Sequence, residues 1–145
     1  MFIDDVVNSG AMPSLEATLR FAGQRQRLLA HNIANWTTPN FRPVDASPAG
    51  FQKALSKAID SRRRATGGES GELRIDSPEV KQLPGGGLVL TPRTPSQGIL
   101  AHDRNNTDLE RLMSDHAENQ MVFRVASELL RSRIQQLRDA MAERV

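Results

Sequence analysis

The sequence contains no cysteine and no tyrosine, and aromatic residues make up only 4% of its 145 residues. The absence of cysteine excludes a disulfide framework, a thiolate zinc site and a cysteine nucleophile. No stretch approaches the roughly 20 apolar residues that span a membrane. Residues 1–5 lack a basic region followed by an apolar run, so we expect no ordinary cleaved signal peptide.

The hydrophobic content of 38% is low for a compact domain, whereas 25% of the residues are charged. Compact domains usually contain about 45–50% apolar residues, and disordered chains contain far fewer. This balance favours a helical or elongated molecule with a thin hydrophobic core. The formal net charge of +2 gives little support for nucleic-acid binding.

Proline and glycine are concentrated in the middle of the chain. Residues 107–145 contain neither, and both residue types interrupt regular structure. We therefore expect a mainly α fold in which two long terminal helices pack as an antiparallel coiled-coil hairpin. The expected segments are residues 1–42 (first helix and turn), residues 43–106 (irregular middle) and residues 107–145 (last helix).

Apolar residues of the first segment recur at alternating spacings of three and four. This spacing places them on one narrow stripe of a helix, as in a coiled-coil seam. We expect Ser14 to cap this helix and Pro39 to prevent its continuation. The expected stripe, completed by a glutamine, consists of Met12, Leu15, Leu19, Ala22, Gln26, Leu29 and Ile33.

The last segment repeats this pattern over a longer run, with Asn106 or Thr107 as its cap. Because one helix cannot bury such a stripe alone, we expect the two helices to pack together. Arg20, Arg25 and Arg27 would then lie beside the acidic start of the last helix. The hairpin is thin and needs further packing partners, either from the middle segment of the chain or from other chains. The expected stripe consists of Leu109, Met113, His116, Gln120, Phe123, Ala126, Leu130, Ile134, Leu137 and Met141.

The middle segment is predicted to contain one short helix and a small β-hairpin. Ser47-Pro48 is typical of an N-cap followed by proline at the first helical position, and the helix is expected to end near Arg63. Residues 73–80 partly alternate and residues 87–91 are β-prone. The proline and glycines between them favour a loose turn.

Two other hypotheses compete with a purely structural role. The run Arg62–Arg64 suggests a helical protein that binds nucleic acid or an acidic surface, although cations also suit a solvated helix end. An enzyme with a dispersed site around His31 or His102 has no supporting spacing, and nucleophile, P-loop and dinucleotide motifs are absent. We therefore expect no enzymatic activity, no metal and no cofactor, and we expect His116 to pack or contact a partner.

The segment 30–41 carries more polarity than the end of a helix requires. Asn32 and Asn35 share a helix face near that end, where their amides can bind free carbonyl groups or a neighbouring chain. Asn40 can adopt the left-handed conformation of a turn. Trp36 and Phe41 flank the turn as apolar anchors. This combination of amide and aromatic side chains suits a buried interface.

This segment resembles the signature of the rod proteins of the bacterial flagellar basal body, most closely the proximal rod proteins of type B. In that signature, Asn-Ile-Ala-Asn precedes Thr-Pro-Gly-Tyr. Here residues 32–35 are Asn-Ile-Ala-Asn and residues 38–41 are Thr-Pro-Asn-Phe. Residues 105–110 (Asn-Asn-Thr-Asp-Leu-Glu) and 117–120 (Ala-Glu-Asn-Gln) resemble the family's last helix and the residues that lead into it. The middle of the chain shows no specific match.

The resemblance implies a structural subunit of the proximal rod that polymerises through its terminal helices, links the membrane ring to the distal rod and transmits torque. The implied partners are other copies of itself, other rod proteins, the rod-ring adaptor, the membrane ring protein and the flagellar type III export apparatus, but no nucleic acid. The implied location is the periplasmic rod of the basal body. The residues expected at the assembly interface are Leu15, Leu19, Leu29, Asn32, Ile33, Asn35, Trp36, Thr38, Pro39, Phe41, Leu109, Glu118, Asn119, Phe123, Leu130, Ile134 and Leu137.

Overall fold

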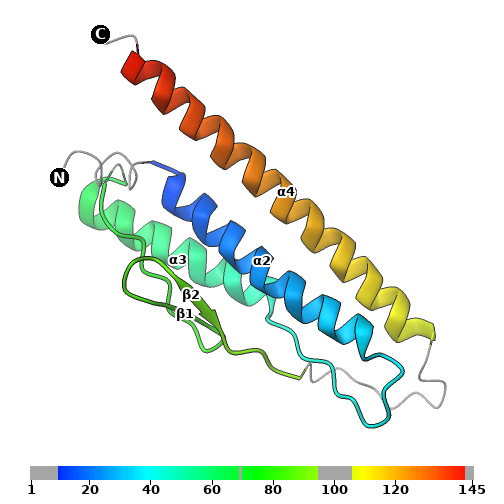
Figure 1. Ribbon diagram of the computed structural model, residues 1–145. Coiled ribbons are helices and arrows are strands. Elements are labelled where there is room, and N and C mark those ends of the chain that lie inside the picture. The colour runs from blue at the N-terminus through cyan, green and yellow to red at the C-terminus, as the bar shows by residue number, and fades with distance from the viewer. Residues whose placement is uncertain (1–9, 69, 95–105, 143–145) are drawn as a thin grey trace.

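The computed structural model describes residues 10–68, 70–94 and 106–142, without the side chains of 106–108. In these residues the elements are α2 (Met12–Ala34), α3 (Pro48–Thr66), β1 (Val80–Gln82), β2 (Leu88–Leu90) and α4 (Asn106–Ala142). α2 lies between α4 on one side and α3 with the hairpin on the other (Figure 1). The expected mainly α fold, with its first and last helices packed together, is confirmed. None of the described helices is both long and apolar enough to cross a bilayer.

α2 is buried on two faces, so the expected single stripe is only part of its buried surface. Within that stripe, Met12, Ala22 and Leu29 are buried, whereas Leu15, Leu19 and Ile33 are partly exposed. A second row, also spaced by three and four, faces α3, the hairpin and the segment before α3. This second row consists of Ala17, Phe21, Arg25, Leu28 and Asn32.

Both ends of α2 differ from the expected positions. The N-cap is Ala11, and the Ser14 hydroxyl donates to the Ala11 carbonyl oxygen at 2.7 Å, so the prediction that Ser14 caps the helix is wrong. The helix begins earlier because Pro13, in its first turn, has no N–H that would need a partner. At the other end α2 stops at Ala34, before Pro39 is reached.

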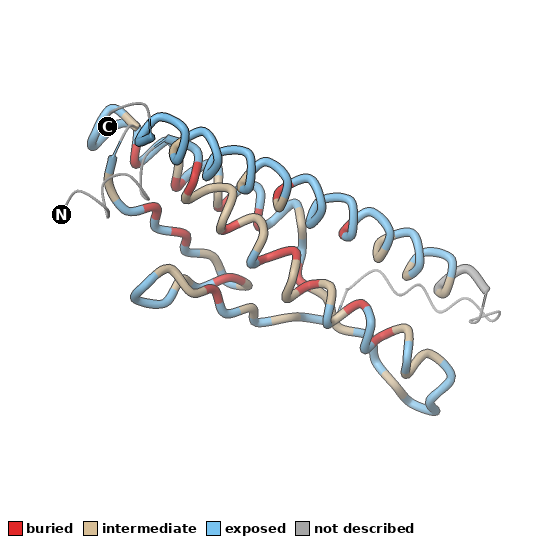
Figure 2. Tube along the Cα trace, turned by 45° about the horizontal axis from the view of Figure 1, so that its top comes forward, coloured by how far each residue is buried: buried red, intermediate tan, exposed pale blue. Residues whose placement is uncertain are grey.

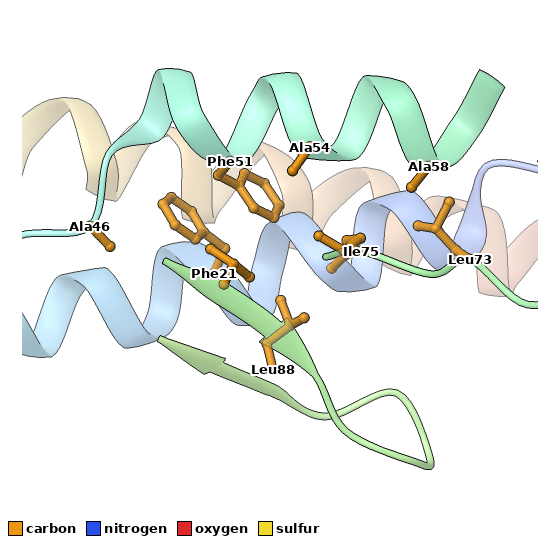
Figure 3. Packing of buried hydrophobic residues seen from close by; sticks show 10 residues of the cluster. Phe21, Ala46, Phe51, Ala54, Ala58, Leu73, Ile75 and Leu88 are labelled. Atoms are coloured by element: carbon orange, nitrogen blue, oxygen red, sulfur yellow. The ribbon is translucent and has the colours of Figure 1, made fainter. Parts of the chain in front are cut away.

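The hydrophobic core lies on the side of α2 that faces away from α4. At its centre the rings of Phe21 and Phe51 stack, with their centroids 4.1 Å apart and their planes 4° from parallel (Figure 3). Most of its other members come from the middle of the chain, which therefore supplies the neighbour that the thin helix pair needs. The buried core cluster comprises Ala17, Phe21, Ala46, Phe51, Ala54, Ala58, Leu73, Ile75, Val80 and Leu88.

The predicted start of the middle helix is confirmed. The Gly50 N–H donates to the Ser47 hydroxyl oxygen at 3.0 Å, and Pro48 is the first residue of α3. The helix ends at Thr66, three residues beyond the expected end. Gly67 terminates it in the left-handed conformation (φ 74°), which glycine adopts without a steric penalty.

The β-hairpin forms as predicted, but its first strand is displaced. β1 and β2 are antiparallel, with Val80 opposite Leu90, whereas the prediction placed the first strand at residues 73–80. That strand is interrupted because Pro78 has no N–H for a ladder. Residues 73–77 instead run beside the core, and the Ile75 N–H donates to the Gln82 side-chain oxygen at 2.9 Å.

α4 runs antiparallel to α2, and its C-terminal end extends beyond the first turn of α2 (Figure 1). It has 37 residues against 23 in α2, or roughly 56 Å against 35 Å at 1.5 Å per residue. Most of the α4 surface is exposed (Figure 2). Of its described side chains, only Asn119 and Ala126 are buried. The last helix is therefore attached to its own subunit by a narrow contact.

The expected charge pairing between the two terminal helices is contradicted for Arg25, and the side chain of Asp108 at the acidic start of α4 lies outside the described residues. In the part of the chain that the structure describes, no ion pair joins α2 to α4. Arg25 lies on the other face of α2 and pairs with Asp45 at 2.7 Å, while Arg20 pairs with Glu16 at 3.6 Å. Arg27 remains exposed. The pairing fails because the helical period directs Arg25 away from α4.

Candidate assembly interface

A hydrogen-bonded polar network joins α2 to α4. Asn119 is 3% exposed, and its Nδ2 donates to the Ala22 carbonyl oxygen at 2.9 Å and to Gln26 Oε1 at 2.7 Å. The Gln26 amide nitrogen then faces His116, whose Nε2 accepts at 2.6 Å. His116 thus packs at the helix contact, as its place on the predicted stripe suggests. A polar network of this kind fixes the register of two helices.

Replacing Asn119 with alanine is expected to lower the free energy of unfolding by about 1–3 kcal/mol, because one buried and one part-buried hydrogen bond are lost and Gln26 keeps an acceptor without its donor. Urea denaturation followed by circular dichroism measures this loss. Ser114→Ala, on the exposed surface of the same helix, is the matched control, with an expected change of about 0.5 kcal/mol or less. Equal midpoints for the two variants would contradict a structural role for the Asn119 amide.

Asn32 holds the chain after the turn against α2. Its side chain is 1% exposed; Nδ2 donates to the Val44 carbonyl oxygen at 2.8 Å, and Oδ1 accepts from the Val44 N–H at 3.2 Å. One amide therefore satisfies both backbone groups of one residue. Asn32 was expected at the assembly interface, but in this structure its polar atoms are engaged inside the subunit.

Asn35 forms the end of α2. Its backbone N–H and its Nδ2 both donate to the His31 carbonyl oxygen, at 3.1 Å and 2.9 Å. The backbone N–H is the ordinary helical donor to this carbonyl, and the side-chain amide adds a second hydrogen bond to it. Of the two alternatives expected for this amide, the structure shows the one within the chain, a hydrogen bond to a carbonyl at the end of α2.

The turn after α2 has the predicted backbone conformation. Asn40 has a φ of 59°, in the left-handed region that asparagine tolerates better than most residues. Phe41 is half-buried, and its ring meets the His31 ring edge-on at 5.5 Å. Trp36 is also half-buried, whereas Thr38 and its neighbouring proline are exposed at the tip of the turn.

The predicted stripe of α4 is only partly covered by α2. Leu109, Leu130 and Leu137 are half-buried, while Phe123 is 42% and Ile134 is 37% exposed. The contact is centred on Asn119 and Ala126, which are seven residues apart. Ala126 belongs to the predicted stripe, whereas Asn119 does not, because the stripe was completed by the neighbouring Gln120, which is exposed.

A second apolar surface of α4 was not predicted. We call it the outer flank and define it as Met121, Val122, Val125 and Leu129, which are 72%, 41%, 54% and 51% exposed. Three of them follow one another at intervals of four residues, so they lie on one face of the helix. The sequence shows the same spacing, as a second stripe beside the one from which the seam is predicted. Contiguous exposed apolar residues of this kind mark interaction surfaces.

A groove of about 1120 Å³ lies on another side of α4, between α2 and the end of β2 with the segment that follows it. We call it the arginine groove. Gly23 gives space to the Phe123 ring, since an added Cβ would lie 3.4 Å from its Cε2. None of the lining residues is acidic. They are Arg20, Gly23, Gln24, Gln26, Arg27, Leu28, Leu90, Pro92, Gln120, Phe123 and Arg124.

The basic run Arg62–Arg64 does not form a surface patch of three arginines. Arg62 is 8% exposed, and it donates through Nη1 to the Gly10 carbonyl oxygen at 2.8 Å and through Nε to the Ser70 carbonyl oxygen at 3.1 Å. It therefore ties the end of α3 to the start of α2, which removes one of the three arginines from the patch proposed for nucleic acid. In the described residues no three His, Asp or Glu side chains are grouped to hold a metal ion.

Some sequence predictions lie outside the described residues. They concern His102, the side chains of Asn106 and Thr107, and most of the motif at 105–110. Of the residues expected at the interface, Glu118 is exposed and available, whereas Leu29 is buried within the subunit. The structure thus separates the expected set into residues that build the subunit and residues that remain on its surface.

Comparison with known proteins gives a consistent result. No protein-family profile and no solved structure matches the sequence. The chain is 31% identical over 128 residues to the flagellar basal body rod protein FlgB of Salmonella typhimurium, covering 83% of this chain and 89% of that protein. The FlgB protein of Borrelia hermsii is 32% identical over 105 residues, with coverages of 68% and 71%. The Escherichia coli K12 protein is 28% identical over 135 residues, with coverages of 85% and 91%.

Proposed function

This chain belongs to the FlgB family of flagellar basal body rod proteins, and on that premise we propose that it polymerises through its terminal helices as a subunit of the proximal rod. Family membership makes it a structural component of the flagellar basal body and not an enzyme. In the proposal, residues 1–42 and 107–145 form the polymerising part, and residues 43–106 support it.

The observation that carries the proposal is the exposure of α4. Only two of its described side chains are buried, yet it displays apolar side chains on more than one side, including Met121, Val125 and Met141. Exposed apolar surface of this extent is unfavourable in water, and burying it contributes about 25 cal/mol per Å². Neighbouring subunits in a rod would supply that burial along the whole helix.

The resemblance supports further parts of the proposal. The terminal helices would pack as a coiled coil with Leu130, Ile134 and Leu137 in its seam, and the Trp36–Phe41 turn would contact a neighbour. The rod segment would join the membrane ring to the distal rod and transmit torque. The rod-ring adaptor and other rod proteins would be partners, and the flagellar type III apparatus would export the subunit to the periplasmic rod without a cleaved signal peptide.

Replacing Leu130 with aspartate is expected to reduce incorporation into the basal body about tenfold, because a charge would enter the half-buried seam. Arg131→Asp changes the next residue, which is exposed, and is expected to retain nearly normal incorporation. Purified basal bodies from a strain that lacks the chromosomal gene are immunoblotted for each variant, and swimming is scored alongside. Equal incorporation of both variants would contradict the seam, and motility of the deletion strain would contradict the rod function.

A further inference from the structure

We propose that the outer flank of α4 in one copy seats in the arginine groove of the next copy. The inference rests on the proposed rod function and identifies the two surfaces that meet. It commits to a second copy of this chain as the occupant of the groove.

The outer flank is apolar and carries acidic residues at its two ends. Glu118 precedes Met121, and Glu128 stands between Val125 and Leu129 along the helix; both glutamates are exposed. Neither has an ion-pair partner among the residues that the structure describes. The basic residue of this stretch, Arg124, lines the groove on another side of the helix. The flank therefore presents an apolar strip with a carboxylate near each end, neither of them held in an ion pair by the described residues.

The arginine groove has the complementary composition. Leu28, Pro92 and Phe123 contribute apolar surface, and Arg27 and Arg124 contribute positive charge. Neither of these arginines has an ion-pair partner in the described part of the chain, and no carboxylate lines the groove. An occupant that is apolar in the middle and acidic at its edges satisfies both requirements. The outer flank meets this description.

The charges at the edges of the two surfaces are all exposed: Glu118 and Glu128 on the flank, and Arg27 and Arg124 in the groove. Exposed ion pairs contribute only about 0–1 kcal/mol each. The apolar surface would therefore provide most of the affinity, while the charges would fix which partner docks and in which orientation.

The two surfaces lie on different sides of the same helix, so each copy can use both at once. A contact between two different surfaces of one molecule is heterologous, and when its rotation does not close a ring it propagates into an open helical array. A rod requires that kind of contact. The same pair of surfaces, repeated from copy to copy, would cover Met121, Val122, Val125 and Leu129, which are exposed in the isolated subunit.

The decisive experiment is a charge reversal with a compensating reversal. Glu118→Arg with Glu128→Arg reverses the flank, and Arg27→Glu with Arg124→Glu reverses the groove. Each double variant is expected to lower incorporation into basal bodies about tenfold, since like charges then face each other. The quadruple variant, in which every contact is reversed, is expected to recover to within about threefold of wild type. Circular dichroism of each purified variant shows whether it retains wild-type helix content.

The outcomes separate this inference from the rod function on which it rests. Wild-type protein absent from basal bodies would overturn the rod function. Wild-type protein present, with normal incorporation of both double variants or no recovery in the quadruple variant, would overturn the docking alone. If a double variant loses helix content, crosslinking between folded single-cysteine variants tests the docking instead.

Because the natural sequence has no cysteine, each introduced cysteine is unique. Val125→Cys on the flank and Gln24→Cys in the groove are placed in two copies that carry different tags, and oxidation of intact cells is expected to join the two tags. Ser56→Cys, exposed on α3, replaces the groove cysteine in the control and is expected to give no such product. Capture of Val125→Cys by a different rod protein, or equal joining in the control, would overturn the inference.

Discussion

Replacing Phe21 with alanine is expected to lower the free energy of unfolding by about 3–5 kcal/mol. Phe21 is 4% exposed and stacks on Phe51 at a centroid distance of 4.1 Å, so its removal leaves a cavity between α2 and α3. Domains are stable by only about 5–15 kcal/mol in total. The variant is therefore expected to unfold at a clearly lower urea concentration, as followed by circular dichroism at 222 nm, a wavelength at which helices absorb.

Phe123→Ala is the matched control for this prediction. A phenylalanine is again replaced by alanine, but the ring of Phe123 is 42% exposed and lies at the contact between α2 and α4. We expect a loss of about 1 kcal/mol or less in the isolated protein, because less apolar surface leaves a buried environment. A loss as large as that of Phe21→Ala would show that α4, and not the α2–α3 side, carries the stability of the subunit.

This contrast shows which part of the fold the sequence could predict. Both terminal helices were predictable because proline and glycine are absent from them or nearly so, and because their apolar residues follow a helical period. The side of α2 that holds Phe21 was missed, since a second row of residues 17, 21, 25, 28 and 32 mixes apolar, basic and amide side chains. Its burial depends on partners from the middle of the chain that local periodicity does not reveal.

The candidate site was predictable in part for a similar reason. The family signature drew attention to Asn32, Asn35 and Asn119, but their hydrogen bonds to Val44, to a helical carbonyl and to Gln26 required the folded chain. The turn at residue 40 was predictable because it is a local property of asparagine. The outer flank and the arginine groove were not, because each depends on how far α4 is rotated against α2.

Asp45 illustrates a residue whose importance only the fold reveals. Its carboxylate accepts from Arg25 Nε at 2.9 Å and from Arg25 Nη2 at 2.7 Å, a two-point contact that matches the shape of the guanidinium group. Its backbone exchanges hydrogen bonds of 3.0 and 2.9 Å with Arg93, in the segment after β2. Asp45 therefore joins α2, the start of the middle segment and the end of the hairpin.

Replacing Asp45 with alanine is expected to destabilise the protein by about 3–5 kcal/mol, because Arg25 is left as a buried charge without its partner. Arg25→Met is expected to cost less, about 1–3 kcal/mol. The two side chains differ in exposure, at 6% for Arg25 and 19% for Asp45, so water reaches the carboxylate more easily. Asp45 also keeps its hydrogen bond from the Ala46 N–H at 2.8 Å. Asp45→Ala is therefore expected to lose more stability than Arg25→Met, although each variant breaks the same ion pair.

The double variant Arg25→Met with Asp45→Ala tests the origin of that asymmetry. If the damage in Asp45→Ala comes from an unpaired buried cation, removing the cation as well will restore part of the stability, and the double variant will be more stable than Asp45→Ala alone. Equilibrium urea denaturation of the four proteins measures the coupling. Strictly additive losses would mean that the Asp45 carboxylate acts independently of Arg25, for example through its hydrogen bond from the Ala46 N–H, and that the ion pair contributes little to holding the middle segment against α2.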